Sequence, residues 1–252
     1  MQIRTITAAD ETNGVEDAIR QIWSSGFLEM APHAYDSIAS SPVPVATLAV
    51  GAGLCWAYKR SAALAFGVGV GVLFYSALGR ALVNAAFGLA VAREAKKTMF
   101  GIASRWQSPG AVFFVALDDA GAPLGCVGIK FGHTLSPTVK EPCCDNSGTE
   151  ASIWRLSVSP HARSQGVGRT LMIAAEAWAR VGGIKHISLL CGNPESVKFY
   201  KKLEYTYETE ARARTAMYGV GGRAAGFAGW FQCILDALLR KRVTSTVFCK
   251  KL

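Results

Sequence analysis

Residues 154–170 constrain the fold of this chain more than any other stretch. Trp154–Val158 is rich in apolar and β-favouring residues, which predicts a short strand that a proline then ends. Gly166 and Gly168 follow, and Thr170–Val181 has helical character. A strand, a glycine-bearing turn and a helix start in this order form an anion site, because the N–H groups of the first helical turn converge and the helix dipole favours negative charge there.

The glycine pattern differs from the two commonest nucleotide-binding turns. A dinucleotide-binding turn needs a third glycine and an acidic residue about 20 residues further on. Position 171 is Leu171, and the next predicted strand offers His186 and Ser188 without a carboxylate. A P-loop needs lysine after its last glycine, and Arg169 stands there. Since the chain has 26 glycines, a plain helix-start turn remains an alternative interpretation.

Residues 163–168, Arg-Ser-Gln-Gly-Val-Gly, resemble the Arg/Gln-x-x-Gly-x-Gly/Ala signature of the GNAT acetyltransferase superfamily. Downstream, Ile187–Leu190 and Asn193–Leu203 resemble the fifth strand and the following helix of that fold. The resemblance covers roughly residues 1–40 and 110–252. It implies the acyl-CoA N-acyltransferase fold of the α/β (α+β) class, in which a mixed, mostly antiparallel sheet has helices on both faces.

Hydrophobic periodicity predicts the remaining elements of such a fold. Val15–Phe27 predicts an amphipathic helix because its apolar residues recur at helical spacing, and Asp118–Pro123 predicts a hairpin turn by its composition. Strands are expected at residues 3–7, 111–117, 124–129, 154–158, 186–190, 205–213 and 244–250, and further helices at 170–181 and 194–203.

A long apolar segment interrupts this pattern between residues 43 and 92, where the only charges are Lys59, Arg60 and Arg80. Ser61–Gly79 gives 19 uncharged residues, which as a helix are roughly 28 Å long and close to the hydrocarbon thickness of a bilayer. Both flanking parts belong to one predicted domain, so they lie on one side of the membrane and an odd number of crossings is excluded. We therefore expect a membrane hairpin, against the alternative of two buried core helices.

This insertion divides the chain into three parts: the first strand and helix at residues 1–42, the membrane hairpin at 43–92, and the rest of the acetyltransferase domain at 93–252. A hairpin between the first helix and the second strand resembles the camello-like branch of the superfamily. That resemblance implies a membrane-associated N-acetyltransferase of the endoplasmic reticulum that acetylates cysteine S-conjugates, other small amines or protein lysines.

Basic residues indicate the side of the membrane on which the domain lies. The hairpin tip carries two of them, and the domain side carries five, which favours a cytosolic domain by the positive-inside rule. Met1–Arg20 has no apolar core and does not resemble a signal peptide. The seven cysteines are an odd number without zinc spacing, which is typical of reduced thiols that face the cytosol.

The C-terminal part of the chain carries most of the positive charge. Residues 198–252 hold 11 Lys/Arg against 4 Asp/Glu, so +7 of the total charge of +9 lies there. Ala224–Arg242 predicts a basic amphipathic helix with aromatic residues, which indicates either an interfacial contact with membrane lipid or a helix packed on the domain. No recognition motif supports nucleic-acid binding.

The family resemblance also assigns residues that bind acetyl-CoA, the acetyl donor of the family. Backbone groups of Leu156 and Val158 are expected to pair with the pantetheine arm between the fourth and fifth strands, where one N–H can polarise the thioester carbonyl. Asn193 is expected either to bond the pantetheine from the other side or to cap the following helix. The turn residues expected at the diphosphate are Arg163, Ser164, Gln165, Gly166, Val167, Gly168 and Thr170.

Two residues are candidates for proton transfer. Tyr200 stands at the family position whose hydroxyl protonates the CoA sulfur; the alternative is a core tyrosine. Many relatives have a glutamate base at the position of Ser152, so Glu150, two residues earlier, is the candidate here, against a solvated loop charge or a water relay. Glu204 departs from the family, which has a left-handed glycine there. No metal is expected.

These features predict a membrane-anchored N-acetyltransferase that moves an acetyl group from acetyl-CoA to a primary amine. The missing strand-four glutamate favours the alternative of a catalytically silent acyl-CoA-binding scaffold at a membrane. The two hypotheses share the cofactor turn and differ in whether the residues around it carry out chemistry.

Overall fold

The computed structural model describes residues 1–32, 36, 77–81, 84–85, 87–96, 98–106, 108–132, 149–193, 196–212 and 244–252. The chain divides into two compact units. The first comprises Met1–Phe27, Ala92–Ala213 and Thr244–Leu252, and the second comprises Leu28–Val91 and Arg214–Val243. All of the predicted site residues lie in the first unit, which is described below.

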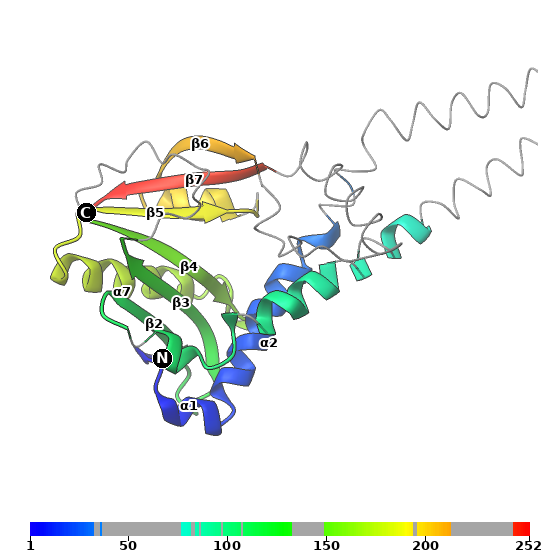
Figure 1. Ribbon diagram of the computed structural model, residues 1–252, viewed down its shortest axis with the longest axis horizontal. Helices are drawn as coiled ribbons and strands as arrows, with labels where there is room; N and C mark the ends of the chain where they lie inside the picture. Colours follow the sequence, from blue (N-terminus) through cyan, green and yellow to red (C-terminus); the bar gives the residue numbers. More distant parts are fainter. Residues whose placement is uncertain are drawn as a thin grey trace, which may run out of the picture. The chain divides into compact units, whose positions relative to one another are not determined.

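A mixed sheet forms the body of the first unit (Figure 1). Within the described residues the strand order is β1-β2-β3-β4-β5-β7-β6, and every neighbouring pair is antiparallel except β4 and β5. The predicted mixed, mostly antiparallel sheet is therefore confirmed. The strands are β1 (Gln2–Thr5), β2 (Ala111–Leu117), β3 (Pro123–Phe131), β4 (Glu150–Val158), β5 (His186–Cys191), β6 (Thr206–Arg212) and β7 (Thr244–Lys251).

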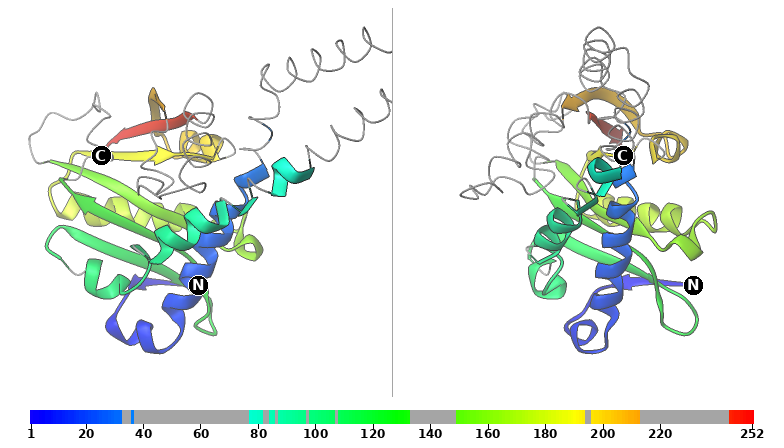
Figure 2. Two further views of the ribbon diagram at one scale, coloured as in Figure 1. Left: turned by 45° about the vertical axis from the view of Figure 1, so that its right-hand side comes forward. Right: turned by 90° about the vertical axis from the view of Figure 1, so that its right-hand side faces the viewer.

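Helices pack on both faces of this sheet (Figure 2). Along β2 the side chains alternate: Val112 and Ala116 belong to the core cluster that includes the buried side of α7, whereas Phe113 packs against Trp106 of α6, with ring centroids 5.3 Å apart. Gly128 permits this second contact, because a Cβ there would come within 2.5 Å of the Trp106 ring. The helices include α1 (Ala8–Thr12), α2 (Val15–Leu28), α6 (Ile102–Trp106), α7 (Val167–Val181) and α8 (Val197–Lys202), with a 3-10 turn at Pro160–Ala162, and residues 87–96 are helical as well.

Two adjacent strands part in the middle of the sheet. β4 and β5 pair only over Glu150–Ile153, opposite His186–Leu189, and diverge beyond this point (Figure 1). At the same place β4 bulges, because Arg155 has a φ of 56° and the register with β3 shifts between Cys126 and Gly128. We call the region beyond the last β4–β5 pair, where these two strands no longer bond to each other, the strand gap.

Most of the predicted elements are confirmed, mostly within one or two residues of the predicted bounds, and the larger differences lie at β4, α7 and α8. β4 begins at Glu150, four residues before the predicted strand, and α7 begins at Val167, three residues before the predicted helix. α8 begins at Val197, and Ser196 directly before it is in a 3-10 turn. Residues 194–195 lie outside the described residues, so the predicted helix start at position 194 remains a prediction.

Several predictions lie outside the described residues. These are most of the membrane hairpin at 43–92, most of the loop after β3, and the amphipathic helix at 224–242. In the part of the chain that the structure describes, no helix has both the length and the apolar character to cross a bilayer. The boundaries of the three predicted parts remain predictions.

The cysteines depart from expectation at one position. Cys126 and Cys191 are free, as predicted for reduced thiols. Cys249 is disulfide-bonded, so the prediction of reduced cysteines throughout the chain is wrong there. Spacing along the sequence could not reveal this, because a disulfide depends on which cysteines the fold brings together.

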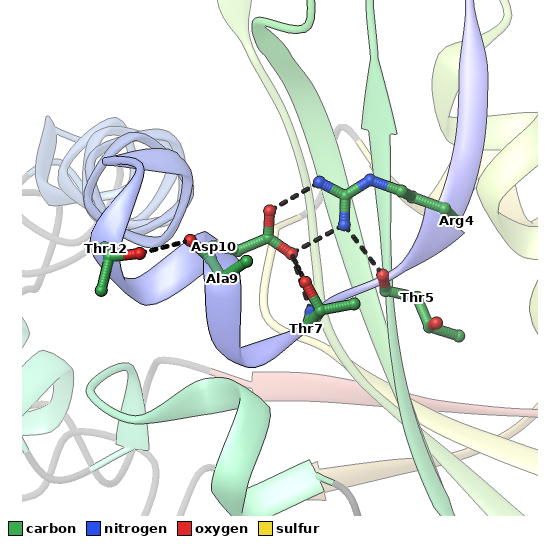
Figure 3. Close-up of polar contacts among 6 residues, drawn as sticks. All are labelled: Arg4, Thr5, Thr7, Ala9, Asp10 and Thr12. Atoms are coloured by element: carbon green, nitrogen blue, oxygen red, sulfur yellow. Dashed lines mark hydrogen bonds and ion pairs between the residues drawn. The ribbon is translucent and has the colours of Figure 1, made fainter.

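A buried ion pair fixes the N-terminal edge of the sheet (Figure 3). Asp10 of α1 is 2% exposed and accepts hydrogen bonds from both terminal nitrogens of Arg4, at 2.7 and 2.5 Å. The N–H of Thr7 donates to the same carboxylate at 2.7 Å, which caps the start of α1. The Arg4 guanidinium is the main reason that the pKa of Asp10 falls from 3.8 to about 2.

Candidate active site

The turn between β4 and α7 presents backbone donors that the protein leaves unused. Gly166 is the N-cap of α7 and has a φ of 83°, which a residue with a Cβ rarely adopts. The first N–H that bonds within the helix is that of Thr170, which donates to the Gly166 carbonyl at 3.0 Å. Among the described residues, the N–H groups of Val167, Gly168 and Arg169 have no acceptor. Three convergent donors at a helix N-terminus form an anion-binding site.

The side chains of this turn mostly point outward. Arg163 and Gln165 are exposed and bond to carbonyl groups of the preceding residues, through Nε to Val158 at 3.4 Å and through Nε2 to His161 at 2.8 Å. Ser164 is also exposed and has a left-handed φ of 63°. These contacts shape the turn, and the exposed groups surround its free donors.

Two predicted turn residues contribute differently from the others. Val167 is 2% exposed and its side chain belongs to the core, so only its backbone N–H can serve a ligand. Thr170 donates its hydroxyl to the Gly166 carbonyl at 3.1 Å. The structure thus brings all of the predicted turn residues together, but it favours backbone donors over side chains as the ligand-binding groups.

Gly168 brings the two sides of the strand gap into contact. A Cβ at this position would lie 3.3 Å from the Phe199 ring of α8 and 3.4 Å from the Val158 side chain of β4. These distances are shorter than ordinary van der Waals contacts, so glycine lets α8 approach the start of α7. As a result, α8 lies directly beside the anion-binding turn.

Val158 directs its backbone toward the strand gap. The N–H of Ser159 donates to Leu124 of β3 at 2.8 Å, and backbone direction alternates along a strand, so the N–H and C=O of Val158 point away from β3. Leu156 lies beyond the last β4–β5 pair as well, directly after the bulge. Their side chains pack against the core cluster on the α7 side, which leaves the backbone of β4 as the surface that faces the gap.

Tyr200 lies in an aromatic cluster beside the gap. Its side chain is 8% exposed, and its ring centroid lies 5.2 Å from Phe199, 6.1 Å from Tyr205 and 5.6 Å from Phe248. Burial raises the pKa of Tyr200, with a smaller contribution from nearby Cys191, so the hydroxyl is protonated at neutral pH. Among the described residues it has no hydrogen-bond partner, and this suits a proton donor.

The end of α8 fixes the position of Tyr200 without the expected glycine. Glu204 adopts a φ of 66°, which is the left-handed conformation that glycine has in the family. Its N–H donates to Lys201 at 3.1 Å, and the N–H of Tyr205 donates to Tyr200 at 3.1 Å. These two bonds form a Schellman motif, which ends the helix in the usual way at the cost of strain at Glu204.

The two remaining predicted residues lie at the ends of β4 and β5. Glu150 is confirmed as part of β4, opposite His186, but it stands three residues before Ile153, where the gap begins, which is roughly 10 Å along a strand. The main-chain carbonyl of Asn193 accepts bonds from the Ser196 N–H at 3.0 Å and the Cys191 thiol at 3.1 Å. The Ser196 N–H bond to Asn193 is that of a 3-10 turn, and residues 194–195 lie outside the described residues, so both alternative roles of Asn193 remain predictions.

The sequence interpretation missed a buried polar cluster on the sheet-facing side of α7. Glu176 is 5% exposed and accepts hydrogen bonds from the Tyr205 hydroxyl at 3.1 Å and from Lys250 Nζ at 3.1 Å, with Arg180 3.4 Å away. A glutamate among the apolar positions of an amphipathic helix is the signal that could have revealed it. Within the described residues, no group of three His, Cys, Asp or Glu side chains could hold a metal ion.

The comparison with protein families identifies this arrangement. The model described as acetyltransferase (GNAT) family matches residues 85–205, which contain the strand gap, the turn and α8. Residues 85–205 carry a GNAT acetyltransferase domain. The GNAT fold predicted from the two motifs is confirmed, whereas the family match does not distinguish the camello-like branch. No match emerges from the curated proteins.

Solved structures resemble the chain at low identity. A GCN5-related N-acetyltransferase from Kribbella flavida is 17% identical with a TM-score of 0.47, and the match covers 100% of this chain and 97% of that one. The PaiA N-acetyltransferase from Thermoplasma acidophilum, in complex with coenzyme A, is 14% identical with a TM-score of 0.41, covering 100% and 98%. A phosphinothricin acetyltransferase from Sinorhizobium meliloti, in complex with AcCoA, is 16% identical with a TM-score of 0.41, covering 64% and 69%. Of two structures from Bacillus anthracis and Exiguobacterium, the chain spans only 65% and 64% of the length.

Proposed function

We propose that this GNAT domain transfers an acetyl group from acetyl-CoA to a primary amine, in a protein that is attached to a membrane. The observation that carries the proposal is the set of unused N–H groups of Val167, Gly168 and Arg169, next to the helix that presents Tyr200. Acetyl transfer from CoA requires a binding site for the diphosphate and a proton donor for the departing sulfur. The anion-binding turn can provide the first, and the protonated hydroxyl of Tyr200, on the opposite side of the strand gap, can provide the second.

The residues of the turn fit the diphosphate of CoA. Its negative charge would lie against the N-terminal end of α7, where the helix dipole and the amide donors stabilise it. Arg163 and Thr170 are exposed beside these donors and can add side-chain contacts. The pantetheine arm would then run along β4, bonded by the backbone of Val158 and Leu156 on one side and by Asn193 on the other.

The chemistry requires two proton transfers. A neutral amine attacks the thioester carbon, so that a C–N bond forms and the C–S bond breaks. Tyr200 would donate a proton to the departing sulfur, and a backbone N–H of β4 would stabilise the negative charge on the carbonyl oxygen. The surplus proton of the amine would leave through Glu150 or through water. The distance of Glu150 from the gap favours water.

The acceptor and the location are proposed from the sequence. The hairpin at residues 43–92 would hold the protein in the membrane of the endoplasmic reticulum, with the catalytic domain facing the cytosol and the helix at 224–242 lying on the lipid surface. The acceptor would be a cysteine S-conjugate, another small amine or a protein lysine.

The direct test is acetyl transfer by the full chain, purified in detergent and given labelled acetyl-CoA with a panel of amines. We expect label in at least one amine product, together with saturable CoA binding measured by calorimetry. If CoA binds but no amine is acetylated, the alternative of a silent acyl-CoA-binding scaffold replaces this proposal. A chain that does not bind CoA would contradict both functions.

Two substitutions test the assigned roles within that assay. Gly168→Asp places a carboxylate beside the diphosphate and should weaken CoA binding at least ~100-fold, whereas Gly26→Asp, on an open position of α2, is its control. Tyr200→Phe should lower kcat by about 10²-fold and leave CoA affinity unchanged, because a general acid contributes about that much. Tyr205→Phe removes a neighbouring hydroxyl that bonds Glu176, and is the control for Tyr200.

A further inference from the structure

The bulge in β4 lies at the start of the strand gap. Arg155 follows Ile153, the last residue of β4 that pairs with β5, by two positions, and it directly precedes Leu156. Its φ of 56° is unusual for a residue with a long side chain, since the left-handed region is sterically unfavourable for all residues except glycine. Something in the surrounding structure therefore holds Arg155 in this conformation.

The side chain of Arg155 is held by three residues from outside the sheet. Its Nη2 lies 2.5 Å from the Glu94 carboxylate and 3.0 Å from the Thr98 hydroxyl, and the guanidinium lies over the Trp23 ring, 4.8 Å from the centroid. The Arg155 and Glu94 side chains are 13% and 17% exposed. We call these four residues, Arg155, Glu94, Thr98 and Trp23, the arginine clamp.

The main chain of Arg155 is also engaged. Its carbonyl lies 3.4 Å from the Cys126 thiol on β3, at the point where the β3–β4 register shifts. Cys126 is fully buried, so the carbonyl faces β3 while the guanidinium reaches α2 and the segment at 92–98. The peptide unit between Arg155 and Leu156 is thus held by the carbonyl contact with Cys126 and, through the Arg155 side chain, by the contacts with Glu94 and Thr98.

We propose that Arg155 is a positioning residue: the arginine clamp holds the bulge in the geometry that turns the backbone of Leu156 and Val158 toward the thioester. This inference rests on the proposed function, because it assumes that a β4 amide stabilises the oxygen of the reacting carbonyl. Such a donor acts only when its N–H points at the place where the charge develops. A rotation of one peptide unit at Leu156 would remove it.

The same contacts could instead only stabilise the fold, and the two roles have different consequences. A buried ion pair that merely supports the fold lowers the melting temperature when it is broken and leaves kcat unchanged in the protein that remains folded. A clamp that aims a donor lowers kcat. In that case CoA affinity falls much less than kcat, because the diphosphate turn at Gly166 and Gly168 is untouched.

The molecule contains a matched control for this test. Arg20 of α2 also combines an acidic neighbour with an aromatic ring, since it lies 3.9 Å from the Glu16 carboxylate and 3.8 Å from the centroid of the Phe100 ring. Arg20 and Arg155 therefore make the same kinds of contact, but only Arg155 lies on β4. A change that substitutions of both arginines cause therefore reflects a loss of fold stability. A change that only the Arg155 substitution causes reflects the geometry of the strand gap.

The experiment compares Arg155→Lys, Glu94→Ala, Glu94→Gln and Arg20→Lys with the wild type in the acetyl-transfer assay, with melting temperatures and CoA affinities measured on the same samples. We expect kcat to fall about tenfold or more for Arg155→Lys and Glu94→Ala. Removing an oxyanion donor lowers kcat roughly 10²–10³-fold, and a donor that points in the wrong direction should cause a part of that loss. The KM for acetyl-CoA should change less than about twofold, and Glu94→Gln, which keeps the hydrogen bond, should restore most of kcat.

The inference is overturned if Arg155→Lys and Glu94→Ala lower the melting temperature but keep the wild-type kcat, or if Arg20→Lys lowers kcat equally. Should Glu94→Ala not fold, Arg155→Lys and Glu94→Gln still separate the two roles. Failure of the proposed function looks different, because the wild type would then bind CoA without acetylating any amine.

Discussion

Among the buried carboxylates of this domain, Asp10 and Glu176 differ in where their partners come from along the chain. Asp10, at the N-terminal edge, finds its partners within six residues of itself, in Arg4 and Thr7. Glu176, on the helix that begins with the cofactor turn, draws its partners from further along the chain, and Lys250 is 74 residues away. One carboxylate closes a local turn, whereas the other ties separate elements together.

This difference determines what each site can affect. The Asp10 site joins β1 to α1, and its hydrogen bonds among the described residues do not reach β4 or β5. Glu176 holds β7 through Lys250 and holds Tyr205, three residues after the end of α8, so it connects both to α7. Because the Tyr205 N–H also bonds the Tyr200 carbonyl at the end of α8, the environment of the proposed acid depends on Glu176.

The largest effect is expected for Glu176→Ala. Removing the carboxylate leaves the Lys250 ammonium and the Tyr205 hydroxyl buried without it, and breaking a buried pair in this way costs about 3–5 kcal/mol. Chemical denaturation measures the loss, with Arg180→Ala as the control, since that side chain is 50% exposed and its pair contributes at most about 1 kcal/mol. If Glu176→Ala and Arg180→Ala lowered the unfolding free energy equally, Glu176 would not be the residue that ties the separate elements together.

A smaller effect is expected for Asp10→Asn. The amide keeps the shape of the side chain but loses the charge that Arg4 and the Thr7 N–H bind, which should cost about 1–2 kcal/mol of unfolding free energy. Acetyl transfer measured well below the melting temperature should stay within about twofold of the wild type. A large fall in kcat would show that this edge is not independent of the gap.

The pH dependence of the Asp10 site sharpens the comparison. The pKa of Asp10 is lowered from 3.8 to about 2 in the folded protein, so its stabilisation is fully present above about pH 4 and disappears as the pH falls through about 2. The stability difference between wild type and Asp10→Asn should therefore be constant from pH 6 to pH 4 and shrink below that. Denaturation curves at pH 6, 4, 3 and 2 measure it, and a constant difference down to pH 2 would contradict the assignment.

The smallest expected effect is a gain of stability. Glu204→Gly replaces a strained left-handed residue by the one that adopts this conformation freely, which should stabilise the protein by about 0.5–1 kcal/mol after the greater flexibility of the unfolded chain is included. Thermal unfolding measures the shift, and Gly183→Ala, at a φ of 76°, should shift stability in the opposite direction. If Glu204→Gly lowered the stability instead, the contacts of the Glu204 side chain would stabilise the protein by more than its left-handed backbone destabilises it.

The sequence predicted the elements that depend on local pattern. The continuous apolar run of Ala111–Leu117 before a hairpin turn predicted β2 at its observed bounds, and the glycine turn after β4 was predicted because Gly166 and the start of α7 are neighbours in the chain. The start of α7, at Val167, lies three residues before the predicted one. Local signals fix where a strand or turn lies, but they place a helix start less precisely.

The features that were missed depend on distant contacts. The bulge at Arg155 is held by Glu94 and Thr98, about 60 residues earlier, and no periodicity in β4 indicates a left-handed residue there. The cluster around Glu176 needs β7 to lie beside β5 before Lys250 can reach it. Glu150 was placed correctly in β4, but only the register with β5 shows how far it stands from the gap.

The arginine clamp has a consequence for how this protein should be handled. Glu94 and Thr98 follow the end of the long apolar stretch at position 92 by two and six residues, so the clamp is attached to that stretch by a very short tether. Deleting this stretch, for example to improve solubility, would act along the tether on β4. Turnover measured on such a truncated form would therefore understate that of the full chain.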